Sequence, residues 1–464
     1  MRRLRLSAAA LPLLAAACAL QQPPAREDTR QQALPNLALP EQWKAETSEK
    51  DRAEGDVAAG WLATFHDPQL EALVREALEA NPDLQVAAGR VEQASAYAKL
   101  AGAAIYPQVN LLARGGTKLS ADSSGLNAAG LFVSWELDLW GRVRAGRESA
   151  ASQYDSTALD AEYARQSIAA LVAKSWFLAT EARLQRGLAE DMAASSERLV
   201  SLAQDRLRVG KGSELDVVLA RAGLQTYRDA ARQLELAYRQ ALRALEALAG
   251  RYPAAALEVP PQLAEKPGPV PVGMPSQLLE RRPDVVAAER RVAAAFYRVQ
   301  EANAARLPTI SLTTSLSAIS SDLLVLKDHD NPVWSLGAGV LFPLFSGGAL
   351  KSQVEVRTAE QKLAVAEYGR VGARAFGEVE NALSSEFALD AREALLRQAV
   401  AENERALELE NVRYRVGSVD LRAVQQQQLA LYASRTTLLR VRGEQLVQRV
   451  NLHLALGGGW SAGN

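Results

Sequence analysis

The chain has 464 residues, which is enough for several ordinary domains or for one elongated molecule. Its 53 basic and 54 acidic residues give a formal net charge of −1, and this balance argues against a nucleic-acid-binding protein. Aromatic residues make up only 6%, which is typical of Ala- and Leu-rich helical packing, and the single cysteine, Cys18, excludes an intramolecular disulfide.

The first 17 residues have the order of an export signal. Three arginines precede the apolar run Leu6 to Ala17, which is too short to span a bilayer comfortably as a helix. The run ends in small residues before Cys18, and this ending resembles the lipobox of bacterial lipoproteins, although Leu14 stands four rather than three residues before the cysteine. We expect a lipoprotein signal peptide over 1–17 and diacylglycerol and N-acyl groups on Cys18. The alternative is an ordinary signal peptide with an incidental cysteine.

The next segment, 18–60, is rich in Pro, Gln and charge and has no periodic apolar face. We expect a lipidated, extended N-terminal arm here. A short helix is predicted over Pro68–Ala80, and a second begins at Pro82 and runs to about Ile105.

Two alternating segments follow within about 108–139. In Leu131 to Leu139 the odd positions are apolar and most of the even positions are polar, which predicts a strand with one apolar and one mostly polar face. A shorter alternation lies at Val109 to Leu111.

A very long helix is predicted over 141–209, because this stretch contains no proline and is dominated by residues that favour helices. At about 1.5 Å per residue it would be on the order of 100 Å long, so it needs partners of matching length. A turn at Gly210 to Gly212 leads to a further helix, from about Ser213 to Ala249.

The second half of the chain repeats the first. Pro82 and Pro107 recur 201 residues later as Pro283 and Pro308. The predicted organisation is a first repeat over 61–251, a Pro-rich connector over 252–275, a second repeat over 276–456 and a tail over 457–464. The second repeat is expected to hold strands at about 309–345 and a long helix over 349–416.

The expected fold is therefore mainly α with a small β part, in which long antiparallel helical hairpins accompany four strands. Four strands leave open edges, which a bilayer excludes, and the smallest membrane barrels have about 8 strands, so several copies must pool their strands. Polar side chains suit a water-filled lumen, and those expected there are Ser311, Thr313, Ser315, Glu136 and Asp138. Aromatic side chains suit the lipid side, and those expected there are Trp135, Trp334 and Phe342. The alternative is a soluble sheet capping a coiled coil.

The ordered set of elements resembles the outer-membrane factor family, the TolC-like efflux channels, and most closely its lipoprotein branch that partners resistance-nodulation-division (RND) pumps. The matching segments are 137–142, 342–348 and 414–421, within coverage from about 60 to 456. The resemblance implies a homotrimer with a twelve-stranded transmembrane β-barrel in the outer membrane and a helical tunnel, or α-barrel, across the periplasm. It also implies a passive multidrug-type exit duct for a periplasmic adaptor and an inner-membrane pump, without catalysis, metal or cofactor.

In this family the periplasmic end of the tunnel is closed at the hairpin turns, here Arg206–Val217 and Arg413–Val424. By position, the gate candidates are Asp216, Arg422 and Gln426. Gln426 stands where the family often has an aspartate. The gate could therefore be an acidic ring or a closure by Gln and Arg contacts, and the sequence does not decide between them. The same turns imply the adaptor-contact residues, which are Val209, Gly210, Gly212, Val416, Gly417 and Asp420. The alternative for each residue is a helix cap, a turn glycine or a solvated charge.

The sequence bears on three other functions. An enzyme is disfavoured because the three histidines lie far apart in the sequence and no nucleophile elbow or phosphate-binding loop is present. A structural periplasmic lipoprotein would need the long helices but not the four alternating segments. A duct for type I protein secretion is the alternative within the family, and the cargo, whether drugs, metals or solvents, is not specified by the sequence.

Overall fold

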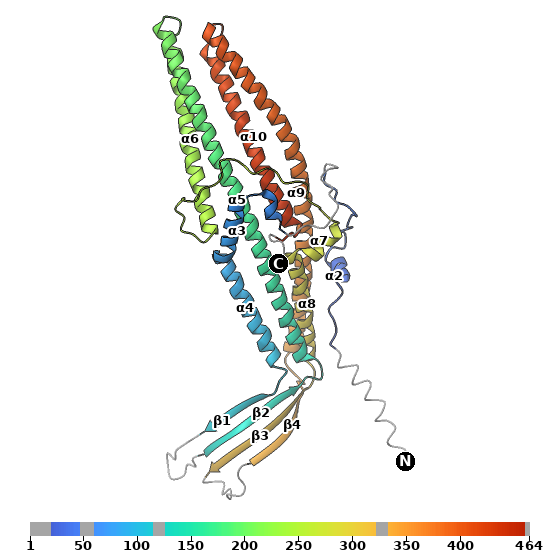
Figure 1. Ribbon diagram of the computed structural model, residues 1–464. Coiled ribbons are helices and arrows are strands. Elements are labelled where there is room, and N and C mark those ends of the chain that lie inside the picture. Colours follow the sequence, from blue (N-terminus) through green and yellow to red (C-terminus); the bar gives the residue numbers. More distant parts are fainter. Residues whose placement is uncertain (1–19, 47–59, 115–125, 322–332, 460–464) are drawn as a thin grey trace. The chain divides into compact units, whose positions relative to one another are not determined.

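The computed structural model describes residues 20–46, 60–114, 126–321 and 333–459 (Figure 1). The predicted signal peptide and Cys18 lie outside these residues. The chain groups into two compact units. Unit 1 comprises Met1–Leu37, Gly89–Asp160 and Asp284–Val371, and unit 2 comprises Ala38–Ala88, Ala161–Pro283 and Gly372–Asn464. Each unit draws on both sequence repeats, so the repeat boundaries stay a sequence-based prediction.

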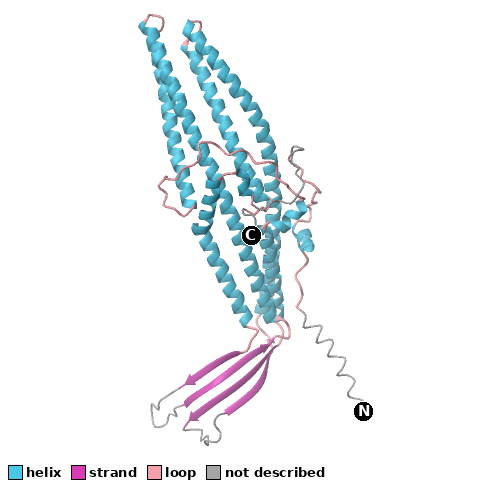
Figure 2. Ribbon diagram, viewed as in Figure 1, coloured by secondary structure: helices cyan, strands magenta, loops and turns pink. Residues whose placement is uncertain are grey.

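Unit 1 contains a four-stranded antiparallel sheet in the order β1-β2-β3-β4, as Figure 2 shows in magenta. The strands are β1 (Gln108–Arg114), β2 (Leu126–Leu137), β3 (Thr309–Ser321) and β4 (Val333–Leu341). The first two come from the first repeat and the last two from the second, and the repeats meet where β2 pairs with β3. The four predicted strands are therefore confirmed, although β1 and β2 extend beyond the alternating cores recognised in the sequence.

The register of the sheet sorts its side chains into two chemically different faces, because directly opposed residues on antiparallel strands point to the same side. One face is apolar and contains Val109, Leu111, Leu131, Val133, Trp135, Ile310, Leu312, Leu316, Trp334, Leu336 and Val340. The other is built mostly from small or polar residues, which are Asn110, Gly130, Ser134, Glu136, Ser311, Thr313, Ser315, Ser335, Gly337 and Gly339. The apolar exceptions on this second face are Phe132, Leu112, Val333 and Leu341. The predicted division into an apolar and a mostly polar face is confirmed.

The N-terminal arm corrects one prediction. Residues 18–60 were expected to be extended, but α2 (Arg26–Ala33) forms a helix within unit 1. Its contacts are mostly polar: Thr29 is buried, and Arg26 Nε lies 2.8 Å from Glu289 Oε2. The helix was missed because its sequence has no apolar stripe, which is the signal that periodicity detects.

The helices otherwise match the prediction closely, except that two short ones, Trp61–Phe65 and Pro275–Arg281, were not expected. Two very long ones, α5 (Arg142–Arg208) and α9 (Ala349–Val416), each contribute to both units, as does α4 (Pro82–Ala103). The remaining elements are η2 (Trp61–Phe65), α3 (Pro68–Ala80), α6 (Glu214–Leu248), α7 (Pro275–Arg281), α8 (Pro283–Ala304) and α10 (Leu421–Ala455). Among the described residues, none of the helices is both long and apolar enough to cross a bilayer.

Unit 2 contains two helical hairpins, and its main core joins them. We call α5 with α6 the first hairpin and α9 with α10 the second. Buried side chains of the first hairpin, such as Trp176 and Leu245, belong to the same apolar cluster as Leu446 and Val450 of α10. The two hairpins therefore pack through a shared core rather than as separate coiled coils.

Ion pairs within the hairpins show the duplication at the level of side chains. Glu197 pairs with Arg228 in the first hairpin, and the residues 207 positions later, Glu404 and Arg435, pair in the second. The pair Arg186–Glu235 recurs as Glu393–Arg442, with the two charges exchanged between the helices.

Candidate functional site at the hairpin turns

The two hairpin turns share one backbone geometry. Gly210 and Gly417 both have positive φ, at 70° and 84°, directly after the long helices end. In each turn the residue after the glycine donates its backbone N–H to the carbonyl oxygen five residues before it. Lys211 N–H donates to Arg206 O at 2.8 Å, and Ser418 N–H donates to Arg413 O at 2.9 Å. This is the bonding expected where a helix ends in a left-handed glycine, so both glycines are required by the turn itself.

The predicted acidic residues of the turns act as helix caps. Asp216 and Ser213 form a capping box in which each side chain accepts a hydrogen bond from the other's backbone N–H, both at 3.1 Å. In the second turn Asp420 accepts from the N–H of Ala423, also at 3.1 Å. Both carboxylates therefore have a structural partner, as the alternative interpretation of these residues predicted.

The other two gate candidates, Arg422 and Gln426, are exposed and lie one turn apart on α10. Among the described residues, neither side chain has a hydrogen bond or ion pair, with Asp216 or with any other group. The three glutamines beside Gln426 are engaged: Gln425 donates to Leu219 O, Gln427 to Asn403 and Gln428 to Ser195. Within this run of four, the side chain of Gln426 is the exposed one.

The sequence did not single out Arg206, which joins the two hairpin ends. Its guanidinium donates to the carbonyl oxygens of Tyr414 and Arg415 on α9, the second at 3.2 Å, and to Lys211 O of its own turn at 3.0 Å. It also lies over the Tyr414 ring, 4.5 Å from the centroid. Tyr414 is buried, and burial raises the pKa of its hydroxyl, so the ring stays neutral under the arginine at physiological pH.

An apolar cluster surrounds this contact and draws on all four helices of the hairpins. Its members are Leu199, Val200, Ala203, Val217, Ala220, Leu224, Tyr414, Leu421 and Val424. The residue equivalent to Arg206 in the second hairpin is Arg413, which instead pairs with Glu410 of its own helix at 2.8 Å. The two arginines have similar sequence surroundings, so only the fold distinguishes their roles.

The predicted adaptor-contact residues fall into two groups. Val209 and Val416 are 66% and 76% exposed, so each turn presents an apolar side chain to solvent. Gly210, Gly417 and Asp420 serve the turns and caps described above. Gly212 also has a local role, because a Cβ there would lie 3.0 Å from the Cβ of Arg206.

Groups that could perform chemistry are scarce in the described part of the chain. It has no cluster of three or more His, Cys, Asp or Glu residues placed to hold a metal ion. His453 is buried and stacked on Trp61 with 5.5 Å between ring centroids, and burial lowers its pKa to about 3. This imidazole is a neutral core residue.

The amino-acid sequence of the chain matches a known protein family and several of its members. The profile of the family described as outer membrane efflux protein matches residues 73–251 and 274–458. The chain is 32% identical over 446 residues to the pyoverdine export outer membrane protein OpmQ of Pseudomonas aeruginosa, with 92% of each chain covered. It is 31% identical over 440 residues to the cation efflux system protein CusC of Escherichia coli O6:H1, covering 92% of this chain and 94% of that protein.

A solved structure agrees with the sequence comparisons. The outer membrane protein VceC of Vibrio cholerae matches with a TM-score of 0.81 and 26% identity, covering 88% of this chain and 100% of that one.

Proposed function

The chain belongs to the outer membrane efflux protein family and is an outer-membrane efflux channel, and we propose that it works as a passive homotrimer within a tripartite efflux system. In this proposal a periplasmic adaptor and an inner-membrane pump, of RND type, deliver cargo to it. The channel forms the exit duct from periplasm to exterior.

The observation that carries the proposal is the sheet of unit 1, which is incomplete in a single chain. Its outer strands, β1 and β4, each pair on one side only within the described chain. Its apolar face is open, with Leu111 74% and Trp334 69% exposed. An open edge needs a further strand and an apolar face of this size needs lipid or protein, and both needs are met if copies join their sheets in a bilayer.

The opposite face of the sheet supports a water-filled interior. Glycines at 130, 337 and 339 and the hydroxyls of Ser and Thr keep this side small and polar. Three copies would supply twelve strands, above the roughly 8 of the smallest membrane barrels. We propose that this face lines the lumen and the apolar face meets the lipid.

The proposed duct performs no catalysis and carries no metal or cofactor. The neutral, packed state of His453 supports this assignment, as does the use of Asp216 and Asp420 as helix caps. The energy for transport would come from the pump. The relatives named above are named for pyoverdine and for cations, which supports a duct whose cargo is chosen elsewhere in the assembly.

Lipidation of Cys18 is part of the proposal. The described chain begins at Leu20, and Gln21 O accepts a hydrogen bond from Gln300 Nε2 at 3.1 Å. Gln300 lies in the last turns of α8, shortly before β3 begins. Acyl groups attached just upstream would thus join the chain close to the sheet, where lipid is expected.

We further propose that the hairpin turns close the periplasmic end of the duct, and that Arg206 supplies the principal contact within each protomer. The exposed Arg422 and Gln426 are the candidates for contact with cargo or ions at this end. An acidic ring from Asp216 has less support, because its carboxylate is occupied by the capping box. The exposed Val209 and Val416 are the favoured adaptor contacts.

The oligomeric state tests the proposal. Native mass spectrometry of the detergent-solubilised protein should give three times the acylated chain mass, with a fragmentation series that releases single chains. A purely monomeric protein at micromolar concentration would contradict the duct and favour the structural lipoprotein.

A further inference from the structure

The connector between the two repeats lies in unit 2, where the chain runs from the end of α6 to α7 (Figure 1). It has no helix or strand from Gly250 to Met274. Trp43 of the N-terminal arm donates to Val272 O and Gly273 O near the end of the connector. Before that point the connector backbone is held by each of the two hairpins, and these two anchors have different chemistry.

The first anchor fixes the connector to the first hairpin. Glu246 of α6 is buried and accepts three backbone hydrogen bonds, from Ala255 and Ala256 at 2.7 Å and from Leu257 at 2.9 Å. Two residues further on, Arg183 of α5 donates to Val259 O, and the Val259 side chain is buried in the core.

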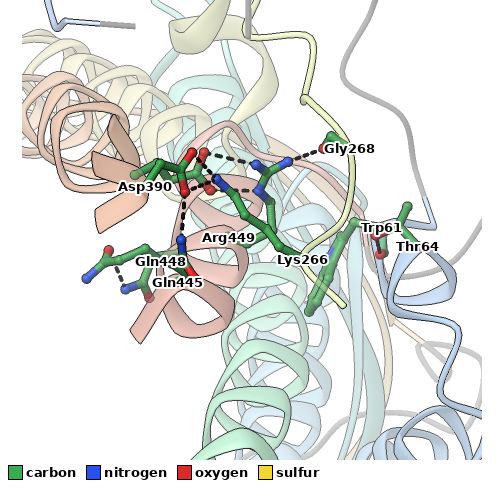
Figure 3. A network of polar contacts seen from close by, with 10 residues as sticks. Trp61, Thr64, Lys266, Gly268, Asp390, Gln445, Gln448 and Arg449 are labelled. Carbon is green, nitrogen blue, oxygen red and sulfur yellow. Dashed lines mark hydrogen bonds and ion pairs between the residues drawn. The ribbon is translucent and has the colours of Figure 1, made fainter. Parts of the chain in front are cut away.

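The second anchor fixes the connector to the second hairpin, and Figure 3 shows it from close by. The buried Arg449 of α10 binds Glu386 of α9 through two hydrogen bonds, at 2.6 and 3.1 Å, and also donates to Gly268 O. Lys266 Nζ lies 2.7 Å from both carboxylate oxygens of Asp390 on α9. One guanidinium therefore joins both helices of the hairpin to the connector backbone.

The duplication shows that this buried ion pair is not needed for hairpin packing. At the equivalent positions of the first hairpin, 207 residues earlier, Arg449 is replaced by Leu242 and Glu386 by Ala179, and both are buried in the apolar core. Apolar residues can replace a buried ion pair without loss of stability in many proteins. The pair does what Leu and Ala cannot, because it holds the carbonyl of Gly268.

The span between the anchors is short and stiff. Only six residues separate Val259 from Lys266, and the first two are Pro260 and Pro261. Fully extended, this span reaches about 25 Å at most, and prolines restrict how far it can shorten or bend.

We propose that Val259–Lys266 is a tie of fixed length between the two hairpins, and that it limits how far the hairpins separate when the channel opens. Glu246 and Arg449 are its positioning residues. The effect on channel opening rests on the proposed function. The limit on the distance between the hairpins does not depend on it. Separation of the hairpins beyond the reach of this span would require release of one anchor.

The test is to lengthen the tie without removing either anchor. Six residues of Gly and Ser inserted between Gln262, which is exposed, and Leu263 add roughly 20 Å of reach. Spin labels at Val209→Cys and Val416→Cys, in a Cys18→Ser background, report the separation of the hairpin ends by pulsed electron paramagnetic resonance. We expect the distance distribution to broaden and its mean to rise by less than the roughly 20 Å of added reach, and the open probability of the channel to rise several-fold.

The control is the same insertion between Tyr252 and Pro253, which are exposed and lie before both anchors. It should leave the distances as in the parent. A second variant, Arg449→Met with Glu386→Leu and Lys266→Met, removes both the Gly268 contact and the Lys266–Asp390 ion pair while imitating the apolar packing of the first hairpin, and it should shift the distances in the same direction.

The outcomes separate the tie from the proposed function. Unchanged distances in the lengthened protein overturn the tie, whether or not the protein conducts. Shifted distances in a protein that forms no pores support the tie and contradict the channel proposal.

Discussion

Replacing Arg206 by alanine should weaken closure at the hairpin ends. The side chain supplies both hydrogen bonds from the first hairpin to the carbonyls of Tyr414 and Arg415, and it covers the Tyr414 ring. Alanine removes these three contacts and the hydrogen bond to Lys211 O of its own turn, but it leaves the turn glycines and both helix caps in place.

The magnitude follows from these contacts. A hydrogen bond from a charged donor contributes about 1.5–3 kcal/mol, and a cation–π contact at an exposed site about 0.5–1 kcal/mol. Arg206 is half-buried and water can replace it at the carbonyls, so we expect a net loss of about 2–3 kcal/mol. Because about 1.4 kcal/mol is a factor of ten, the closed-to-open equilibrium should shift by roughly 30- to 150-fold.

Single-channel recording of the purified protein in planar bilayers measures this shift as open probability. The matched control is Arg413→Ala, since Arg413 is the equivalent residue and pairs only with Glu410 in its own exposed helix turn. An exposed pair of this kind contributes about 0–1 kcal/mol, so the control should change the open probability little. Equal effects of the two substitutions, or none from Arg206→Ala, would refute the assignment of Arg206.

Four further outcomes follow from the structure. Burial holds the pKa of His453 at about 3 in the folded protein, against 6.5 in the unfolded chain. The unfolded chain therefore gains a proton as pH falls below 6.5, and the free energy of unfolding drops by about 2 kcal/mol at pH 5. His453→Phe should reduce the fall in Tm between pH 7 and pH 5. Burial raises the pKa of Glu181 to about 7 from 4.5, so stability falls as pH rises from 4.5 through 7. The full shift corresponds to about 3 kcal/mol at pH 8, and solvent screening of this partly exposed group reduces it to about 2–3 kcal/mol. Glu181→Gln should therefore raise the free energy of unfolding and Tm at pH 8 and change them little at pH 4. Gly130→Val should prevent the pairing of β2 with β3, because even a Cβ there would lie 2.6 Å from the Cβ of Ser317, and gel filtration should then show loss of the assembled protein. Gln426→Asp should increase block of the pore by divalent cations in bilayer recordings, and unchanged block would remove Gln426 from the gate candidates.

The elements with strong periodicity were predictable from the sequence. The long helix over 349–416 coincides with α9, and the faces of the sheet follow from the alternation in Leu131 to Leu137, in which Phe132 is the one apolar residue at an even position. The order of the elements in the second half was predictable from the duplication, because prolines and glycines recur at nearly constant offsets. These features depend on local patterns that a single sequence contains.

Contacts made by polar groups at a distance were not predictable. Arg206 and Arg413 occupy equivalent positions, yet only Arg206 reaches the other hairpin. The connector read as an irregular Pro-rich segment, and nothing in its own sequence indicates that Arg449, about 180 residues away, holds Gly268 O. Helix α2 was not predicted for a related reason, because its contact with the rest of unit 1 includes an ion pair between Arg26 and Glu289, which lie far apart in the sequence.

The central claim is that copies of this chain combine their sheets into a pore, and conductance across a planar bilayer tests it most directly. The purified wild-type protein should produce discrete, uniform current steps, and the assembly-deficient Gly130→Val protein should not. The account would be contradicted if both the wild-type protein and its Arg206→Ala variant inserted into the bilayer as assembled oligomers and remained electrically silent.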